Sequence, residues 1–189
     1  MRELIYYVAV TLDGRIAGPS GQFDFFPMSE AYARELNAEY ADGMPTAVLR
    51  AFGVEAPRSK WDTVIMGRAT YEAGLREGIK SPYAHLEQHV VSSTLPPADY
   101  PEVTIVGGDP LGHVRALKAR PGGNIWLCGG GKLAAQLAPE IDRLVLKLNP
   151  VVAGDGVPLF AGPFRPSAWK LTSHRALELG VVLLSYARA

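Results

Sequence analysis

The chain has 189 residues, 48% of them hydrophobic, and its 19 Lys and Arg residues balance 19 Asp and Glu residues. This length and composition predict a single domain over residues 1–189 with a packed core, and they exclude an intrinsically disordered chain. Zero net charge argues against general nucleic-acid binding, which needs a basic surface that replaces phosphate counterions.

The first half of the chain alternates predicted strands and helices. The apolar run at 4–10 predicts a strand buried on both faces, and Ile16–Ala17 predicts a short second strand. Ser29 is a predicted cap for a helix from Glu30 to Ala41. Residues 42–60 are interpreted as an insertion or lid with a short helix at 46–52. The remaining predictions here are strands at 62–66, 88–92 and 103–106, and a helix at 70–75.

The last part of the chain consists almost entirely of predicted strands. Asp109 is a predicted cap for a helix at 110–119, because Pro110 is tolerated at the first helical position. The pattern then predicts a strand at 124–128, a helix at 132–137, a strand at 141–148, and an antiparallel pair at 168–176 and 180–187. Together the elements predict an α/β fold with a mixed, mostly parallel sheet and a C-terminal antiparallel hairpin. The hairpin offers a sheet edge that two copies can share, so we expect a homodimer.

The N-terminal segment and the cysteine content indicate the cell compartment in which we expect the protein. Cys128 is the only cysteine, so neither an internal disulfide nor a cysteine-based zinc site can form. Residues 1–14 lack the basic start and cleavage site of a signal peptide, and no apolar run approaches the roughly 20 residues that span a bilayer. We therefore expect a cytoplasmic protein without a membrane partner.

Three predicted strand ends carry groups suited to phosphate. Gly129-Gly130-Gly131-Lys132 joins a strand to a helix start, where free N–H groups and the helix dipole favour an anion. Gly67-Arg68 follows a second strand, and Arg68 offers a cationic fork that matches a phosphate monoester. Ser92-Ser93 follows a third. Neither a P-loop nor a Rossmann G-x-G-x-x-G is present, so a dinucleotide would be bound in another manner, and plain structural turns remain the alternative.

Other reactive groups carry weaker signals. His85 and His89 have a spacing that would chelate a metal on a helix, but Val90-Val91 reads as a strand, so no metal site is expected. Asp24 lies among Phe23, Phe25 and Phe26 and is a candidate proton donor, with an exposed turn aspartate as the alternative. Nucleophilic hydrolysis has little support, because no G-x-S-x-G elbow is present and Cys128 has no evident base.

Several motifs occur in an order that resembles the dihydrofolate reductase-like superfamily. They are VAVTLDGRIAG, DFF, VIMGRATYE, VVSST, IWLCGGGKLAAQL and GDGVPLF, and they cover most of the chain. The chain is most similar to the bacterial branch related to the C-terminal reductase domain of the bifunctional riboflavin-biosynthesis deaminase/reductase. This resemblance implies a three-layer α/β/α fold with a central mixed sheet, and NADPH as the hydride donor.

The resemblance also implies roles for individual residues. Main chain at Ala9 and Val10 would lie near the nicotinamide, and Ile16 and Gly18 would flank a mobile loop over it. The cofactor phosphates would be held by Gly67, Arg68 and Thr70, the adenosine end would lie near Ser92 and Ser93, and the pyrophosphate would contact Gly129, Gly130, Gly131, Lys132 and Leu133. Asp24 matches an aspartate of this branch, and the loop 156–160 resembles a segment beside the substrate cavity.

The implied function is reduction of a small heterocyclic or carbonyl-like acceptor by NADPH, with the riboflavin-pathway 5-amino-6-(5-phosphoribosylamino)uracil reductase reaction as one candidate. Folate reduction is less favoured, because neither Glu30 nor Glu35 aligns with the acidic residue that binds the pterin. The zinc deaminase signature cannot be built from one cysteine. An NADPH-binding sensor without efficient turnover remains the alternative. The proton source stays open between Asp24, Glu30 and water.

Overall fold

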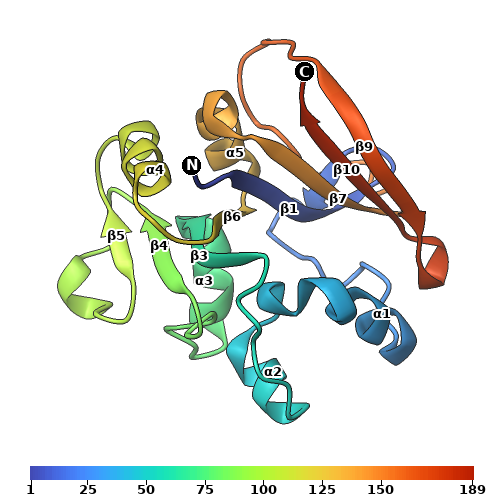
Figure 1. The fold of residues 1–189 in the computed structure, drawn as a ribbon, viewed down its shortest axis with the longest axis horizontal. Helices are drawn as coiled ribbons and strands as arrows, with labels where there is room; N and C mark the ends of the chain where they lie inside the picture. Colours follow the sequence, from blue (N-terminus) through green and yellow to red (C-terminus); the bar gives the residue numbers. More distant parts are fainter.

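An eight-stranded mixed sheet forms the centre of the computed structural model, which describes all residues 1–189 (Figure 1). Its spatial order is β5-β4-β3-β6-β1-β7-β10-β9, and β2 and β8 form a separate pair. The strands are β1 (Leu4–Thr11), β2 (Arg15–Ala17), β3 (Trp61–Gly67), β4 (Glu87–Val91), β5 (Thr104–Val106), β6 (Asn124–Gly129), β7 (Arg143–Asn149), β8 (Val157–Pro158), β9 (Trp169–Ala176) and β10 (Val182–Arg188). The helices are α1 (Glu30–Tyr40), α2 (Thr46–Ala51), α3 (Arg68–Arg76), α4 (Pro110–Ala119) and α5 (Gly131–Leu137).

Six neighbouring strands are parallel, and two antiparallel strands complete the sheet. β5, β4, β3, β6, β1 and β7 run in one direction, so their carboxyl ends share one edge. β10 pairs antiparallel with both β7 and β9. This arrangement confirms the predicted mostly parallel sheet with a C-terminal antiparallel hairpin.

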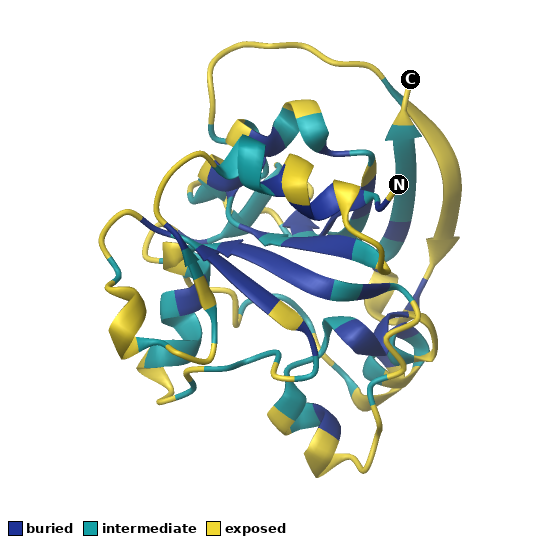
Figure 2. Cartoon of the chain, turned by 60° about the vertical axis from the view of Figure 1, so that its left-hand side comes forward, coloured by how far each residue is buried: buried dark blue, intermediate teal, exposed yellow.

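Helices cover both faces of the sheet and make three layers (Figures 1 and 2). The face below α1 and α3 carries Tyr7, Trp126 and Val145, whereas the face below α4 and α5 carries Tyr6, Leu127 and Leu144. Because the parallel strands are covered on both sides, they need apolar residues at successive positions. The apolar run at 4–10 therefore predicted β1 correctly as a strand buried on both faces.

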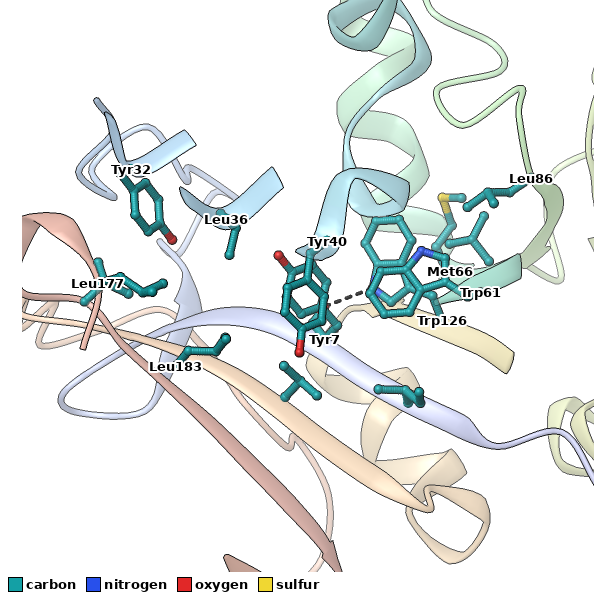
Figure 3. Packing of buried hydrophobic residues seen from close by; sticks show 14 of the residues in the cluster. Tyr7, Tyr32, Leu36, Tyr40, Trp61, Met66, Leu86, Trp126, Leu177 and Leu183 are labelled. Carbon is teal, nitrogen blue, oxygen red and sulfur yellow. Dashed lines mark hydrogen bonds between the residues drawn. The ribbon is translucent and has the colours of Figure 1, made fainter. Parts of the chain in front are cut away.

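An aromatic cluster fills the core on the α1 side (Figure 3). Trp61 stacks on Trp126 with ring centroids 5.4 Å apart, and Tyr7 stacks on Tyr40 at 4.8 Å. Trp126 Nε1 donates a hydrogen bond of 3.0 Å to the Tyr7 carbonyl oxygen, so the buried indole is not left without a partner. The cluster fixes the distance between α1 and the strands β1, β3 and β6.

The segment 42–60 is held firmly against the body of the protein. Asp42 is fully buried, and its carboxylate accepts hydrogen bonds from the backbone N–H of Arg58 at 2.6 Å and of Lys60 at 2.9 Å. The carbonyl oxygen of Asp42 also lies 3.0 Å from His85 Nε2. One buried carboxylate therefore closes the segment into a loop around α2.

The strand β9 differs from the others because it forms an open edge. Seven of its eight residues are exposed, and Figure 2 shows it in the exposed colour along its length. The opposite edge, β5, has only three residues.

None of the helices has both the length and the apolar character that crossing a membrane requires.

Candidate functional site

Two glycine turns meet at the carboxyl edge of the sheet. Gly67 ends β3 and Gly129-Gly130 ends β6, and these two strands are neighbours. A Cβ atom at Gly67 would lie 3.6 Å from the Gly129 carbonyl oxygen, and one at Gly130 would lie 3.6 Å from Thr70 Oγ1. The side chain of Ile16 reaches within 4.0 Å of that same Gly130 position. The structure thus brings together five residues that the sequence predicted for a cofactor.

The helices that follow these turns begin without a capping side chain. α3 starts after Gly67 and α5 after Gly130, and neither glycine has a side chain that could accept a hydrogen bond from the first turn. By contrast, Ser29 caps α1 and Asp109 caps α4 through their side-chain oxygens. Since the first turn of a helix carries N–H groups without intrahelical partners, the edge presents donors that suit an anion.

The residues of the glycine turn and the start of α5 differ in whether they face the edge of the sheet or pack inside the protein. Gly131 packs against the loop after β8, where its carbonyl oxygen accepts a 3.0 Å hydrogen bond from Ala161 N–H. Leu133 is buried in the core below α4 and α5, so only its backbone faces the edge. Lys132 is exposed on α5. A bound pyrophosphate would therefore contact backbone N–H groups here, with Lys132 as the one charged side chain.

Arg68 is held in place at the start of α3. Its Nη1 donates a 2.9 Å hydrogen bond to Thr94 Oγ1, and its Nε lies 3.5 Å from Glu72 Oε1. Thr94 follows β4, so this contact joins the ends of two adjacent strands. Ser92 is buried, and its hydroxyl accepts from the N–H groups of Thr94 and Leu95, which commits it to the turn. Ser93 is exposed and free to face a ligand.

Asp13 clamps two segments that are distant in the sequence. Its carboxylate accepts hydrogen bonds from Thr11 Oγ1 at 2.6 Å, Ala153 N–H at 3.0 Å and Gly154 N–H at 2.7 Å. The Thr11 hydroxyl first, and then these backbone donors, lower the pKa of Asp13 to about 2. Next to the clamp, β2 pairs with β8, so residues 12–18 and 153–161 together cover the edge.

The predicted nicotinamide position has an unforeseen neighbour. Ala9 is half-buried on the face below α1, and its register partner on β7 is Lys147. The Lys147 ammonium lies 4.1 Å from the ring centroid of Tyr7, and burial lowers its pKa to about 8. Val10 is buried on the opposite face, where only its main chain is available. Sequence analysis missed Lys147, although a lysine within the apolar strand LVLKLN is a visible signal.

Asp24 does not reach this group of residues. It is exposed in the turn 23–26, and it lines a shallow hollow of about 430 Å³ with Arg76. Arg76 ends α3, roughly 12 Å along the helix from Arg68 at 1.5 Å per residue. Phe25 and Phe26 pack on each other with centroids 4.6 Å apart and remain half-exposed. The structure thus matches the exposed turn aspartate that the sequence left as the alternative, and the role of Asp24 as a proton donor stays a prediction.

His85 and His89 have different contacts in the structure. His85 contacts Thr46 Oγ1 at 2.7 Å, whereas His89 lies on β4 and its Nδ1 is 3.1 Å from His113 Nε2. The structure contains no group of three or more His, Cys, Asp or Glu side chains placed to hold a metal ion. Burial lowers the pKa of His89 to about 4, so this buried imidazole is neutral at pH 7.

A second hollow lies away from the glycine turns. It has a volume of about 680 Å³ and contains none of the predicted site residues. Its walls come from the end of α1, the start of β3 and the strands β7, β9 and β10, and they include Glu39, Lys60, Arg143 and Arg175. Its position at the start of the parallel strands separates it from the carboxyl edge, where ligands of open α/β sheets collect.

Sequence comparisons match these features to one family. A family model described as the RibD C-terminal domain matches residues 2–183. The uncharacterized protein YwjB of Bacillus subtilis (strain 168) is 30% identical over 161 residues, which cover 84% of this chain and 83% of that protein. The uncharacterized protein YyaP of the same organism is 26% identical and covers 98% of this chain and 94% of its own length.

Solved structures share the fold. A putative riboflavin biosynthesis protein from Shewanella sp. PV-4 superposes with a TM-score of 0.73 at 22% identity, covering 100% of this chain and 99% of that one. Dihydrofolate reductase from Enterococcus faecalis, solved with NADP(H), superposes with a TM-score of 0.64 at 16% identity. The match covers 98% of this chain and 96% of that one. A Thermotoga maritima deaminase/5-amino-6-(5-phosphoribosylamino)uracil reductase gives 0.65 at 13% identity, and the match covers 57% of that longer chain. The dihydrofolate reductase-like fold expected from the motifs is confirmed.

Proposed function

The chain belongs to the family of RibD C-terminal domains, and on this premise we propose that it is an NADPH-dependent reductase of a small heterocyclic or carbonyl-like acceptor. One observation carries the proposal: the turns at Gly67 and Gly129-Gly130 meet at Thr70, and each leads into a helix without a capping side chain. Such a cradle of backbone donors fits the pyrophosphate of a dinucleotide. NADPH supplies the hydride when it is bound, and the protein supplies orientation and a dry surface.

Individual residues have separate tasks in this proposal. Backbone N–H groups of residues 130–133 bind the pyrophosphate, and Arg68 binds the 2′-phosphate of the adenosine ribose, beside Ser93. Ala9 and Ile16 contact the nicotinamide ring with small or apolar surface. Gly18 is buried and donates a 2.7 Å hydrogen bond to the Gln22 carbonyl oxygen, so it shapes the turn that follows β2.

Replacing Arg68 with alanine tests the phosphate assignment. A guanidinium paired with a phosphate makes charge-assisted hydrogen bonds. R68A should therefore weaken the binding of NADPH by about tenfold or more and leave the binding of NADH nearly unchanged. Isothermal titration calorimetry with both coenzymes measures this difference. R34A is the matched control, because Arg34 is also an exposed helical arginine with a glutamate one turn away. Equal losses for NADPH and NADH in R68A would contradict the assignment.

Turnover separates the reductase from a binding protein without activity. NADPH oxidation is followed by absorbance with the riboflavin-pathway aminouracil compound, the acceptor that the Thermotoga maritima reductase's name describes, and with dihydrofolate. Oxidation with the aminouracil supports the proposed reaction. NADPH binding without oxidation of either acceptor favours the sensor, and the absence of NADPH binding removes both. In this scheme Asp24 remains a candidate proton donor, with Glu30 and water as the alternatives.

We also propose that the protein is a homodimer that pairs through β9. An exposed edge strand of eight residues invites pairing with a second copy, and Leu171 on this strand is 46% exposed. Light scattering at micromolar concentration should give twice the chain mass, and Leu171→Asp should shift the protein to a monomer. A wild-type monomer under the same conditions would remove the proposal.

A further inference from the structure

Lys147 places a positive charge on the sheet face where the proposed cofactor and its acceptor would meet. It lies one strand from Ala9 and points to the same face, because in-register partners on parallel strands share a face. Cys128, on the same face, directly precedes the glycine turn. The charge therefore stands beside the candidate site, although no sequence motif of the site includes it.

The ammonium has no partner of opposite charge. Lys147 takes part in no ion pair of the structure; its ammonium lies over the ring of Tyr7, and Cys128 is the one titratable group that acts on its pKa. Burial raises the pKa of Cys128 to about 11 and holds the pKa values of Tyr7 and Tyr83 well above 10. All three groups are neutral at pH 7, so Lys147 is the only charge in this cluster.

On the face that carries Lys147, the burial of the strand residues decreases toward the carboxyl edge. Tyr7, Trp126 and Val145 are buried below the helical layer, but the next residues on the same face toward the carboxyl edge are only half-buried. These residues are Ala9, Cys128 and Lys147. The layer formed by α1 and α3 thus covers the sheet less completely toward its carboxyl edge, and Lys147 keeps part of its surface exposed there.

We propose that Lys147 recognises the acceptor by donating a hydrogen bond to one of its oxygen atoms. The proposal rests on the proposed function and narrows its substrate class to planar heterocycles with an oxo or anionic oxygen. A partly desolvated ammonium bonds such an oxygen strongly, and it has no acceptor for an amino group in the same place. The site should therefore reject heterocycles that carry amino groups where the substrate carries oxygens.

Two matched pteridines test this selectivity. Lumazine, which is 2,4-dioxopteridine, and 2,4-diaminopteridine share one ring system and differ in the groups at positions 2 and 4, together with the N–H groups that the oxo form carries at N1 and N3. We expect the wild-type protein to bind lumazine about tenfold more tightly, and Lys147→Met to lose that preference. Lys80→Met is the control, because Lys80 also lies over a tyrosine ring, that of Tyr100, but is exposed on the surface. Fluorescence titration measures both ligands on the three proteins.

A second measurement does not depend on the affinity of the variant. In lysine-labelled protein, the Nζ resonance that disappears in Lys147→Met should titrate near pH 8 and move to higher pH when lumazine binds, because an oxygen acceptor stabilises the ammonium. A lumazine site that leaves this resonance unchanged, equal binding of both pteridines, or no lumazine binding by the wild-type protein would overturn the proposal. NADPH binding, measured in parallel, tests the proposed function separately, and circular dichroism confirms that the variants fold.

Discussion

A Gly131→Ala variant is expected to bind NADPH about a hundredfold more weakly than the wild-type protein. A Cβ atom at position 131 would lie 2.1 Å from the carbonyl oxygen of Pro158 and 3.4 Å from the N–H nitrogen of Ala161. Both obstacles are backbone atoms, which cannot rotate away. Either the start of α5 or the loop after β8 must therefore move, and the N–H groups of the turn lose their alignment. Isothermal titration calorimetry with NADPH measures the loss.

The same substitution should also lower the free energy of unfolding, by about 1–3 kcal/mol, as other overpacked interiors do. Gly131 has an ordinary helical backbone with no positive φ, so alanine itself is compatible with the conformation. Gly108→Ala is the control, because position 108 also has no positive φ and a Cβ there meets nothing within 4 Å. If Gly131→Ala binds NADPH as the wild type does, the turn after β6 does not hold the cofactor.

Asp42→Ala is expected to lower the free energy of unfolding by about 2–4 kcal/mol, which is the cost of leaving two partly buried backbone donors without their acceptors. The carboxylate is fully buried and bonds the N–H groups of Arg58 and Lys60, so no water replaces it without rearrangement of the segment. Urea denaturation measures the change, and the midpoint should fall with little change in slope.

Two further variants make this result specific. Asp42→Asn keeps one acceptor oxygen and should lose less stability than Asp42→Ala. Asp155→Ala also removes a carboxylate that accepts from a backbone N–H, that of Gly156, but the residue is exposed. Its effect should stay within about 0.5 kcal/mol, as is usual for surface positions. An Asp42→Ala variant as stable as Asp155→Ala would show that the segment 42–60 is not fastened by this carboxylate.

Local sequence predicted the framework of the sheet because parallel strands buried on both faces require apolar runs. The predicted strand at 62–66 lies within β3 and the one at 124–128 lies within β6, and the predicted caps Ser29 and Asp109 both accept hydrogen bonds in the structure. The ends of some elements differ from the predicted ones, because local side chains do not determine where an element begins. The helix predicted at 70–75, for example, begins at Arg68. Residues 157–158 were interpreted as loop, because a two-residue strand exists only through its pairing with β2.

Local sequence could also indicate which turns suit phosphate, since glycine after a strand and before a helix is a local signal. It could not show that Arg68 meets Thr94 or that Ile16 approaches Gly130, because these contacts depend on strand order. The aromatic neighbours of Asp24 were adjacent in sequence and yet leave it exposed, because a turn directs successive side chains apart. Lys147 illustrates the opposite case: its proposed role depends on its register with Ala9, 138 residues away in the chain, which only the fold brings about.

The clamp made by Asp13 has a mechanical consequence for the segments that it joins. Because one carboxylate holds both the turn after β1 and the glycine-rich segment at 153–154, neither flap can swing outward alone. The two distant stretches of chain therefore form one covering body at the carboxyl edge, and displacing either of them breaks hydrogen bonds that fix the other.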